Sequence, residues 1–166
     1  MNIKKIYHDI RRKIFIDAGN RRYQARKLEV EREFDSIKNK TETTTLPIVV
    51  SMTSYPARFH SLEATIKSIV IQTIRPSKIV LYLDDSVANN DVPQNIRSLE
   101  QYGLEIRFRP YDMKPHKKYH FAIQEFPDCD VITVDDDVLY PNDLIETLYE
   151  THKKFPGCVV AARGHK

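Results

Sequence analysis

The spacing of hydrophobic residues changes near residue 46. The change separates an N-terminal helical segment, called the front segment here, from a domain in which strand-like and helix-like segments alternate. In the front segment, isoleucines recur at helical spacing, at Ile3, Ile6, Ile10 and Ile14. This pattern predicts a helix over residues 1 to about 38, interrupted near Gly19-Asn20, where both residues weaken helical order. The polar stretch NKTETTT that follows indicates a linker. We therefore divide the chain into a basic helical extension with its linker, residues 1–45, and a folded domain, residues 46–166.

The folded domain alternates strand-like and helix-like segments. Short apolar runs predict four strands, in LPIVVSMTS, KIVLYLDD, DVITVDDD and CVVAAR, and the alternation of apolar and polar residues predicts another in LEIRFRP. Between them we expect a helix from His60 or Ser61, a short helix closed by Gly103, a helix in HKKYHFAIQEF, and one with Asn142 as N-cap. This alternation favours right-handed crossovers. The predicted fold class is α/β and Rossmann-like, with a mainly parallel sheet flanked by helices and an N-terminal helical extension.

Polar residues follow several of the predicted strands. The sequence TSYPAR ends the first strand, Asp84 and Asp85 end the second, and three aspartates end the fourth. Ligands of open parallel sheets bind outside the carboxyl ends of the strands. We therefore expect these three clusters to converge on one crevice.

The three consecutive aspartates suggest a cation site. On an extended backbone Asp135 and Asp137 would point to the same side and Asp136 to the other. Two such carboxylates repel each other unless a cation lies between them. Mg²⁺ or Mn²⁺ takes one or two carboxylates and completes its shell with water and phosphate oxygens, which predicts a metal-bound diphosphate. The alternative is a polar strand end, where aspartates start turns and cap helices.

Charge is distributed unevenly along the chain. Lysine and arginine outnumber acidic residues two to one in residues 1–40, whereas acidic residues are in slight excess afterwards, and the whole chain carries a net +3. The basic extension can be interpreted in three ways: as a segment lying on an anionic membrane, as a partner-binding helix, or as a solvated helix packed on its own domain.

Several other functions lack their sequence signals. The chain has only four glycines and contains neither GxGxxG nor GxxxxGK[ST], which argues against a dinucleotide oxidoreductase and a P-loop NTPase. It has no recognisable nucleic-acid-binding module, so we expect no nucleic-acid partner. Cys129 and Cys158 fit no zinc or redox spacing, and we interpret them as reduced thiols of a cytoplasmic protein.

Two stretches, IVVSMTSYPARFHSLEATIKSIVIQTIRPSKIVLYLDD and KKYHFAIQEFPDCDVITVDDDVLYPNDLIETLYE, resemble the nucleotide-binding half of a GT-A-fold glycosyltransferase, like those of family 2. The resemblance spans about residues 47–163. Such enzymes transfer a sugar from a nucleotide diphosphate to an acceptor. The resemblance implies a UDP- or GDP-sugar donor, Mn²⁺ or Mg²⁺ at a DxD motif, and a glycan or lipid-linked acceptor.

The resemblance also implies roles for residues after the first two strands. The residues expected against the nucleotide are Thr53, Ser54 and Tyr55. Arg58 either reaches the base or phosphate or braces the loop, since an arginine suits both. Asp84 or Asp85 would contact the base or ribose, or start a turn.

Further roles are implied near the fourth strand. Lys117 and Lys118 lie where the family often places a basic residue near the nucleotide, and a lysine suits a phosphate contact. In the DxD motif, Asp137 is implied as the direct metal ligand, Asp135 as a ribose or metal contact, and Asp136 as the sugar contact.

The sequence departs from the family after the aspartates, where only one helix and one strand are predicted. We therefore expect a truncated donor-binding half without the acceptor half, and we name no catalytic base. The chain is then a glycosyltransferase or an inactive fragment of one, in the cytoplasm or peripherally at the inner membrane face through its N-terminal helix. The alternatives are a non-catalytic remnant, a partner-binding protein, and a nucleotidyltransferase, which would normally need a glycine-rich first loop.

Overall fold

A computed structural model describes residues 3–37, 45–110 and 113–162, with the backbone alone for residues 3–15 and 45. The strands are β1 (Thr45–Thr53), β2 (Arg75–Asp84), β3 (Leu104–Arg109) and β4 (Asp130–Thr133). The α-helices are α1 (Ile3–Ile37), α2 (Phe59–Val70), α3 (Gln94–Arg97), α4 (Lys117–Glu125) and α5 (Leu144–Lys154). Short 3₁₀ turns are η1 (Pro56–Arg58), η2 (Asn89–Asp91), η3 (Ser98–Tyr102) and η4 (Lys114–His116).

The described strands form one parallel sheet in the order β3-β2-β1-β4. In the register, Val50 of β1 lies between Ile79 of β2 and Ile132 of β4. The prediction of an α/β fold with a parallel sheet flanked by helices is confirmed, and the arrangement is consistent with a Rossmann-like fold. Because all strands run the same way, their carboxyl ends meet at one edge of the sheet.

Alternating residues of the strands build two apolar layers. Ile48, Val50 and Met52 belong to the larger core, which also contains the buried side of α2. Val49 belongs to a smaller cluster on the other face, together with Ala122 of α4. Because successive strand residues point to opposite faces, the apolar run in β1 is buried on both sides.

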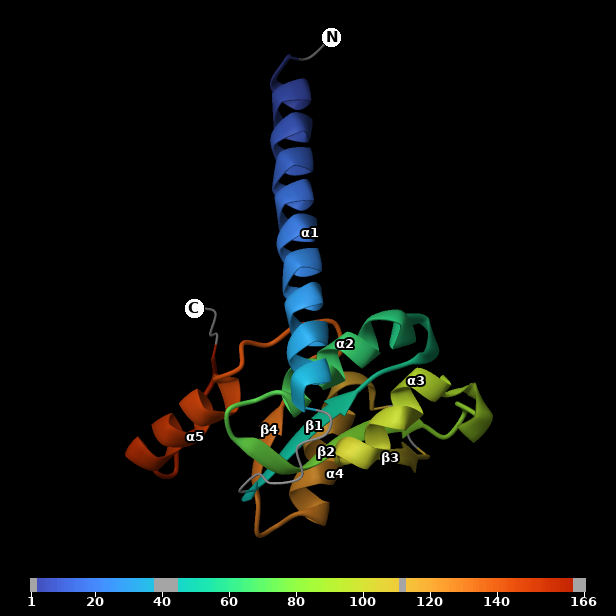
Figure 1. Ribbon diagram of the computed structural model, residues 1–166, viewed down its shortest axis with the longest axis vertical. Helices are drawn as coiled ribbons and strands as arrows, with labels where there is room; N and C mark the ends of the chain where they lie inside the picture. Colours follow the sequence, from blue (N-terminus) through green and yellow to red (C-terminus); the bar gives the residue numbers. More distant parts are fainter. Residues whose placement is uncertain (1–2, 38–44, 111–112, 163–166) are drawn as a thin grey trace.

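The C-terminal end of α1 is part of the folded domain. Val30 and Phe34 are buried in the larger core, and Lys67 of α2 donates a hydrogen bond to Glu31 at 2.6 Å. The rest of the helix extends away from the domain (Figure 1). Within the described residues, no helix combines the length and apolar character needed to cross a membrane.

The expected break at Gly19-Asn20 is wrong, because α1 runs unbroken from Ile3 to Ile37. A single helical glycine costs about 1 kcal/mol relative to alanine, and the arginine-, lysine- and glutamate-rich sequence that follows sustains the helix. The side chains of the predicted isoleucine stripe, residues 3–14, lie outside the described residues.

Two further predictions are wrong. Residues 158–162, in the predicted fifth strand, carry no strand, because strand propensity depends on pairing and burial and no ladder is formed there. The residue before α5 is Asp143 and not Asn142, and no side-chain cap forms. Asn142 instead accepts a hydrogen bond from Arg26 at 2.5 Å and donates one to Glu33, so a tertiary contact replaces the local cap.

Gly103 closes the short helical segment before β3, as predicted. Its φ of 95° lies in the left-handed region, which a glycine adopts without strain. Its carbonyl then accepts a hydrogen bond from Ile79 N at 3.0 Å. The turn therefore ties the start of β3 to β2.

A polar network holds α4 against β2 and β3. Glu125 accepts hydrogen bonds from the Tyr82 hydroxyl at 2.8 Å, from Arg109 Nε at 3.1 Å, and from Arg107. Burial alone would raise the pKa of Glu125, but the hydrogen bonds from Arg109, Tyr82 and Arg107 outweigh it and lower the pKa below its ordinary value of 4.5. The carboxylate is therefore the common acceptor that joins α4 to the sheet.

We predict that Phe34→Ala lowers the free energy of unfolding by about 3 kcal/mol, because it removes a buried ring from the core. The ring packs edge-on against Tyr102, with centroids 4.8 Å apart. Urea unfolding checks the effect. Leu28→Ala, at an exposed position of the same helix, should change stability by less than about 0.5 kcal/mol, and equal losses would contradict the packing of α1 on the domain.

We predict that Glu125→Gln destabilises the fold by about 1–3 kcal/mol at pH 7, since it removes the charge that three donors share. A carboxylate with a lowered folded pKa contributes its full stability above its ordinary pKa and loses it as the pH falls through the folded value. The difference between wild type and variant should therefore shrink below about pH 4.5 in urea titrations. Glu150→Gln, at an exposed pair on α5, should cost under about 1 kcal/mol.

Candidate functional site

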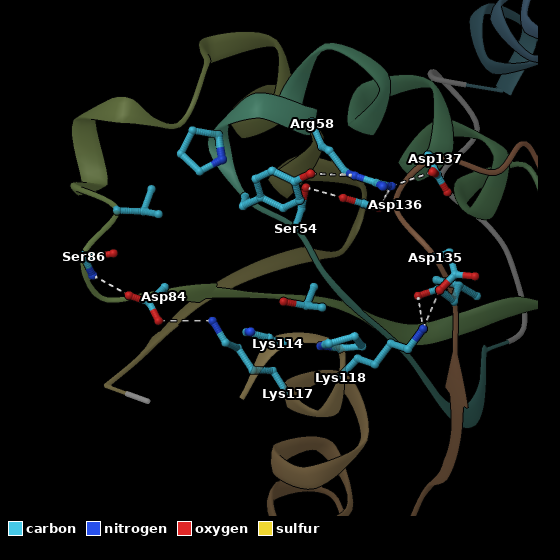
Figure 2. Close-up of a pocket in the computed structure, with 16 residues that line it drawn as sticks. Ser54, Arg58, Asp84, Ser86, Lys114, Lys117, Lys118, Asp135, Asp136 and Asp137 are labelled. Atoms are coloured by element: carbon cyan, nitrogen blue, oxygen red, sulfur yellow. Dashed lines mark hydrogen bonds and ion pairs between the residues drawn. The ribbon is translucent and has the colours of Figure 1, made fainter. Parts of the chain in front are cut away.

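A pocket of about 980 Å³ lies at the carboxyl ends of β1 and β2 and beside the loop after β4. Ten of the eleven predicted site residues line it: Thr53, Ser54, Tyr55, Arg58, Asp84, Lys117, Lys118, Asp135, Asp136 and Asp137. Asp85 is outside the lining, and its N–H donates to the carbonyl of Arg109 at 3.1 Å. The predicted convergence of three polar clusters on one crevice is therefore present in the structure (Figure 2).

Asp136 is the buried member of the aspartate cluster. Ser54 Oγ donates to Asp136 Oδ2 at 2.7 Å, and Thr65 Oγ1 donates to the Asp136 carbonyl at 3.2 Å. Ser54 follows β1, and Thr65 lies on α2. The loop after β4 is thus fixed to both elements, which holds the aspartates at the pocket wall.

Arg58 lies against two of the aspartates. Its Nη1 donates to Asp136 Oδ1 at 3.1 Å and to Asp137 Oδ2 at 2.5 Å, while its Nε donates to the Tyr55 hydroxyl at 3.1 Å. The pKa of Arg58 is raised above its ordinary value by the hydrogen bond to Tyr55 and by Asp136 and Asp137. The guanidinium is therefore a fixed positive charge between the two carboxylates.

Asp135 has a separate cationic partner. Lys118 Nζ donates to Asp135 Oδ1 at 2.6 Å, and the Tyr140 hydroxyl accepts the Asp135 N–H at 2.8 Å. The expected alternation, with Asp135 and Asp137 on one side and Asp136 on the other, is therefore wrong. The strand ends at Thr133 and a turn follows at residues 136–137, so the period of two does not extend to the aspartates.

The opposite side of the pocket is formed by Asp84 and Lys117. Lys117 is buried, and its Nζ donates to Asp84 Oδ2 at 3.2 Å. Ser86 N donates to Asp84 Oδ1 at 3.0 Å. Hydrogen bonds from Ser86 and then from Lys117 lower the pKa of Asp84, so this carboxylate stays charged and oriented near neutral pH.

Sequence reasoning did not identify Ser86, Val87, Lys114 and Pro115, which also line the pocket. Lys114 begins the run KPHKK, whose basic character was the available signal. Val87 is apolar, so nothing in the sequence indicated that it would line a polar pocket. The pocket lining contains four carboxylates and four lysine or arginine side chains, so its formal charges balance.

The aspartates fit a divalent cation. Asp136 and Asp137 already share one positively charged nitrogen, so their oxygens converge on a single cation. Carboxylate oxygens are the ligands that Mg²⁺ and Mn²⁺ prefer. Among the described residues no three His, Cys, Asp or Glu side chains form a metal cage, so the protein would supply only one or two ligands, and water and phosphate would supply the rest.

No model of a known protein family matches the sequence, and no curated protein matches it.

We predict that Ser54→Ala lowers the free energy of unfolding by about 1–3 kcal/mol, because it removes a buried donor to a charged acceptor. Urea unfolding at pH 7 measures the change. Ser36→Ala removes an exposed hydroxyl from α1 and should stay within about 0.5 kcal/mol of wild type. A Ser54 variant as stable as the Ser36 variant would mean that Asp136 does not depend on this bond.

Proposed function

We propose that this domain binds a nucleotide-diphosphate sugar through a divalent metal, as the donor-binding half of a GT-A-like glycosyltransferase. The observation that carries the proposal is the convergence of Asp84, the three aspartates and the basic side chains in one pocket at the carboxyl ends of parallel strands. Ligands of such sheets bind at this edge. The proposed reaction is transfer of the sugar to a glycan or lipid-linked acceptor.

The pocket offers complementary groups for each part of the donor. The exposed ring of Tyr55 suits stacking on a base, and Asp84 suits a ribose hydroxyl or a base N–H. Arg58 and Lys118 supply positive charge for the two phosphates.

Asp137, with Asp135 or Asp136, would hold Mn²⁺ or Mg²⁺. When bound, the metal would neutralise the charge that develops on the diphosphate leaving group. The side chains themselves would orient the donor. We assign no residue as a catalytic base.

One observation favours a second candidate, a non-catalytic domain. Asp84, Asp135, Asp136 and Asp137 each have a lysine or arginine partner within the protein. A pocket with internally balanced charges needs no ligand for its stability, as expected of a remnant that binds a protein partner instead. A nucleotidyltransferase remains the third proposal, and it would prefer a nucleoside triphosphate.

We place the domain in the cytoplasm, at the inner face of the membrane. The support is the basic character of residues 1–40 and the extension of α1 away from the domain (Figure 1). A basic helix in that position suits contact with anionic lipid.

We predict that UDP or GDP raises the melting temperature of the protein in the presence of Mn²⁺ and not in its absence. At about 100 times its dissociation constant, a ligand adds about 2.7 kcal/mol of stability, which is a shift of several degrees in a small domain. The measurement is a thermal-shift screen of UDP, GDP, CDP and ATP, each with and without Mn²⁺. Asp137→Asn should abolish the shift, because it removes a metal ligand.

Asp128→Asn is the matched control, since Asp128 is exposed and outside the pocket lining, and it should leave the shift intact. A shift with ATP larger than with any diphosphate would favour a nucleotidyltransferase. No shift with any nucleotide would favour the non-catalytic domain.

A further inference from the structure

Arg58 occupies the position between the carboxylates that a divalent metal would need. We propose that Arg58 is a built-in counter-cation that the metal must displace, and that the diphosphate draws Arg58 away so that metal binding depends on the nucleotide. This inference rests on the proposed function and concerns the control of the same site. Arg58 is a positioning residue here, because it acts through Asp136 and Asp137.

The geometry makes the two cations mutually exclusive. Arg58 Nη1 lies 3.1 Å from Asp136 Oδ1 and 2.5 Å from Asp137 Oδ2. Mg²⁺ binds carboxylate oxygens at about 2.0–2.1 Å, so a metal on these oxygens would be in direct contact with the guanidinium. Two positive groups at that separation repel, and Arg58 has to leave before the metal can bind.

Arg58 is placed to move without disturbing the core. Its side chain is 39% exposed, and it lies in the 3₁₀ turn η1 and not in a strand or long helix. Its third hydrogen-bond partner, Tyr55, is also exposed. The guanidinium can therefore rotate toward the pocket and leave both carboxylates.

Asp136, in contrast, is held in place. Its side chain is 10% exposed, Ser54 binds its second carboxylate oxygen, and Thr65 binds its backbone carbonyl. When Arg58 leaves, this carboxylate keeps its position and orientation. The metal ligand is therefore preorganised, and the movable group is the arginine.

The diphosphate offers Arg58 hydrogen-bond acceptors that compete with the two carboxylates. A guanidinium binds phosphate oxygens with two parallel hydrogen bonds, so Arg58 can exchange two carboxylate contacts for phosphate contacts inside the same pocket. The exchange frees Asp136 and Asp137 at the moment when phosphate oxygens arrive to complete the metal shell. Diphosphate and metal then favour each other's binding to the same degree, as linkage requires.

Equilibrium dialysis of Mn²⁺ against wild type and variants tests the proposal, with and without UDP or GDP at equal concentration on both sides. Without nucleotide, Arg58→Gln should bind Mn²⁺ about tenfold tighter than wild type, the size expected when the ion pairs of a partly exposed guanidinium no longer compete. With the diphosphate, wild type should gain far more Mn²⁺ affinity than Arg58→Gln, because only wild type has a cation to remove.

Three further variants make the test specific. Arg58→Lys keeps the charge and should retain the weak Mn²⁺ binding of wild type. Tyr55→Phe removes one contact of Arg58 but leaves its charge, and should tighten Mn²⁺ binding by about threefold; it also serves if Arg58→Gln does not fold. Lys114→Gln removes the same charge from another part of the lining and should change Mn²⁺ binding less than Arg58→Gln does.

The outcomes separate this inference from the proposed function. If the diphosphate recruits Mn²⁺ to wild type but Arg58→Gln binds Mn²⁺ alone no more tightly, Arg58 only braces the loop, and the proposed function stands. If Lys114→Gln and Arg58→Gln gain Mn²⁺ affinity equally, the gain comes from the overall charge of the pocket, and the proposal that the metal displaces Arg58 is wrong. If no chain binds Mn²⁺ with any diphosphate, both proposals fail.

Discussion

The hydrogen bond from Ser54 to Asp136 joins the loops that follow β1 and β4, and the pocket depends on it. Both residues are buried, so the bond lies in a medium where an unpaired carboxylate would be costly. It fixes the chain at the point where β4 ends, and Asp135 and Asp137 extend from that fixed point. Their exposed carboxylates can then vary their cationic partners while the backbone between them stays in place.

The sequence contained enough information to predict the sheet and the location of the pocket. Each of the four strands among the described residues coincides with a short apolar run or, for β3, with an alternating segment, and parallel order follows from the helical segments between them. Once the strands are parallel, Thr53, Asp84 and Asp135 must come to the same edge. The convergence of the three polar clusters could therefore be predicted from strand order alone, whereas Lys117 and Lys118, which lie in α4, were expected in the pocket only from the family resemblance.

The features that the sequence could not predict depend on long-range pairing. Asn142 would cap α5 by local preference, but α1 brings Arg26 and Glu33 to it from more than a hundred residues away. Residues 158–162 have strand propensity but no ladder. The repulsion between the aspartates predicted a metal cation beside them, whereas within the protein Arg58 of η1 and Lys118 of α4 supply positive charge to them. Spacing along the chain contains no signal for these partners.

The exposures of the ion pairs distinguish structural from exchangeable contacts within the same pocket. Lys117 is 4% exposed where it meets Asp84, so breaking that pair would leave a buried charge. Asp137 is 48% exposed and Arg58 39%, so water can replace either partner at small cost. A ligand would therefore exchange partners at Arg58 and Asp137 and keep the pair of Asp84 and Lys117. The charge balance of the pocket thus rests on one buried pair and on exposed pairs, and the exposed pairs are those that the proposed anion and metal would exchange.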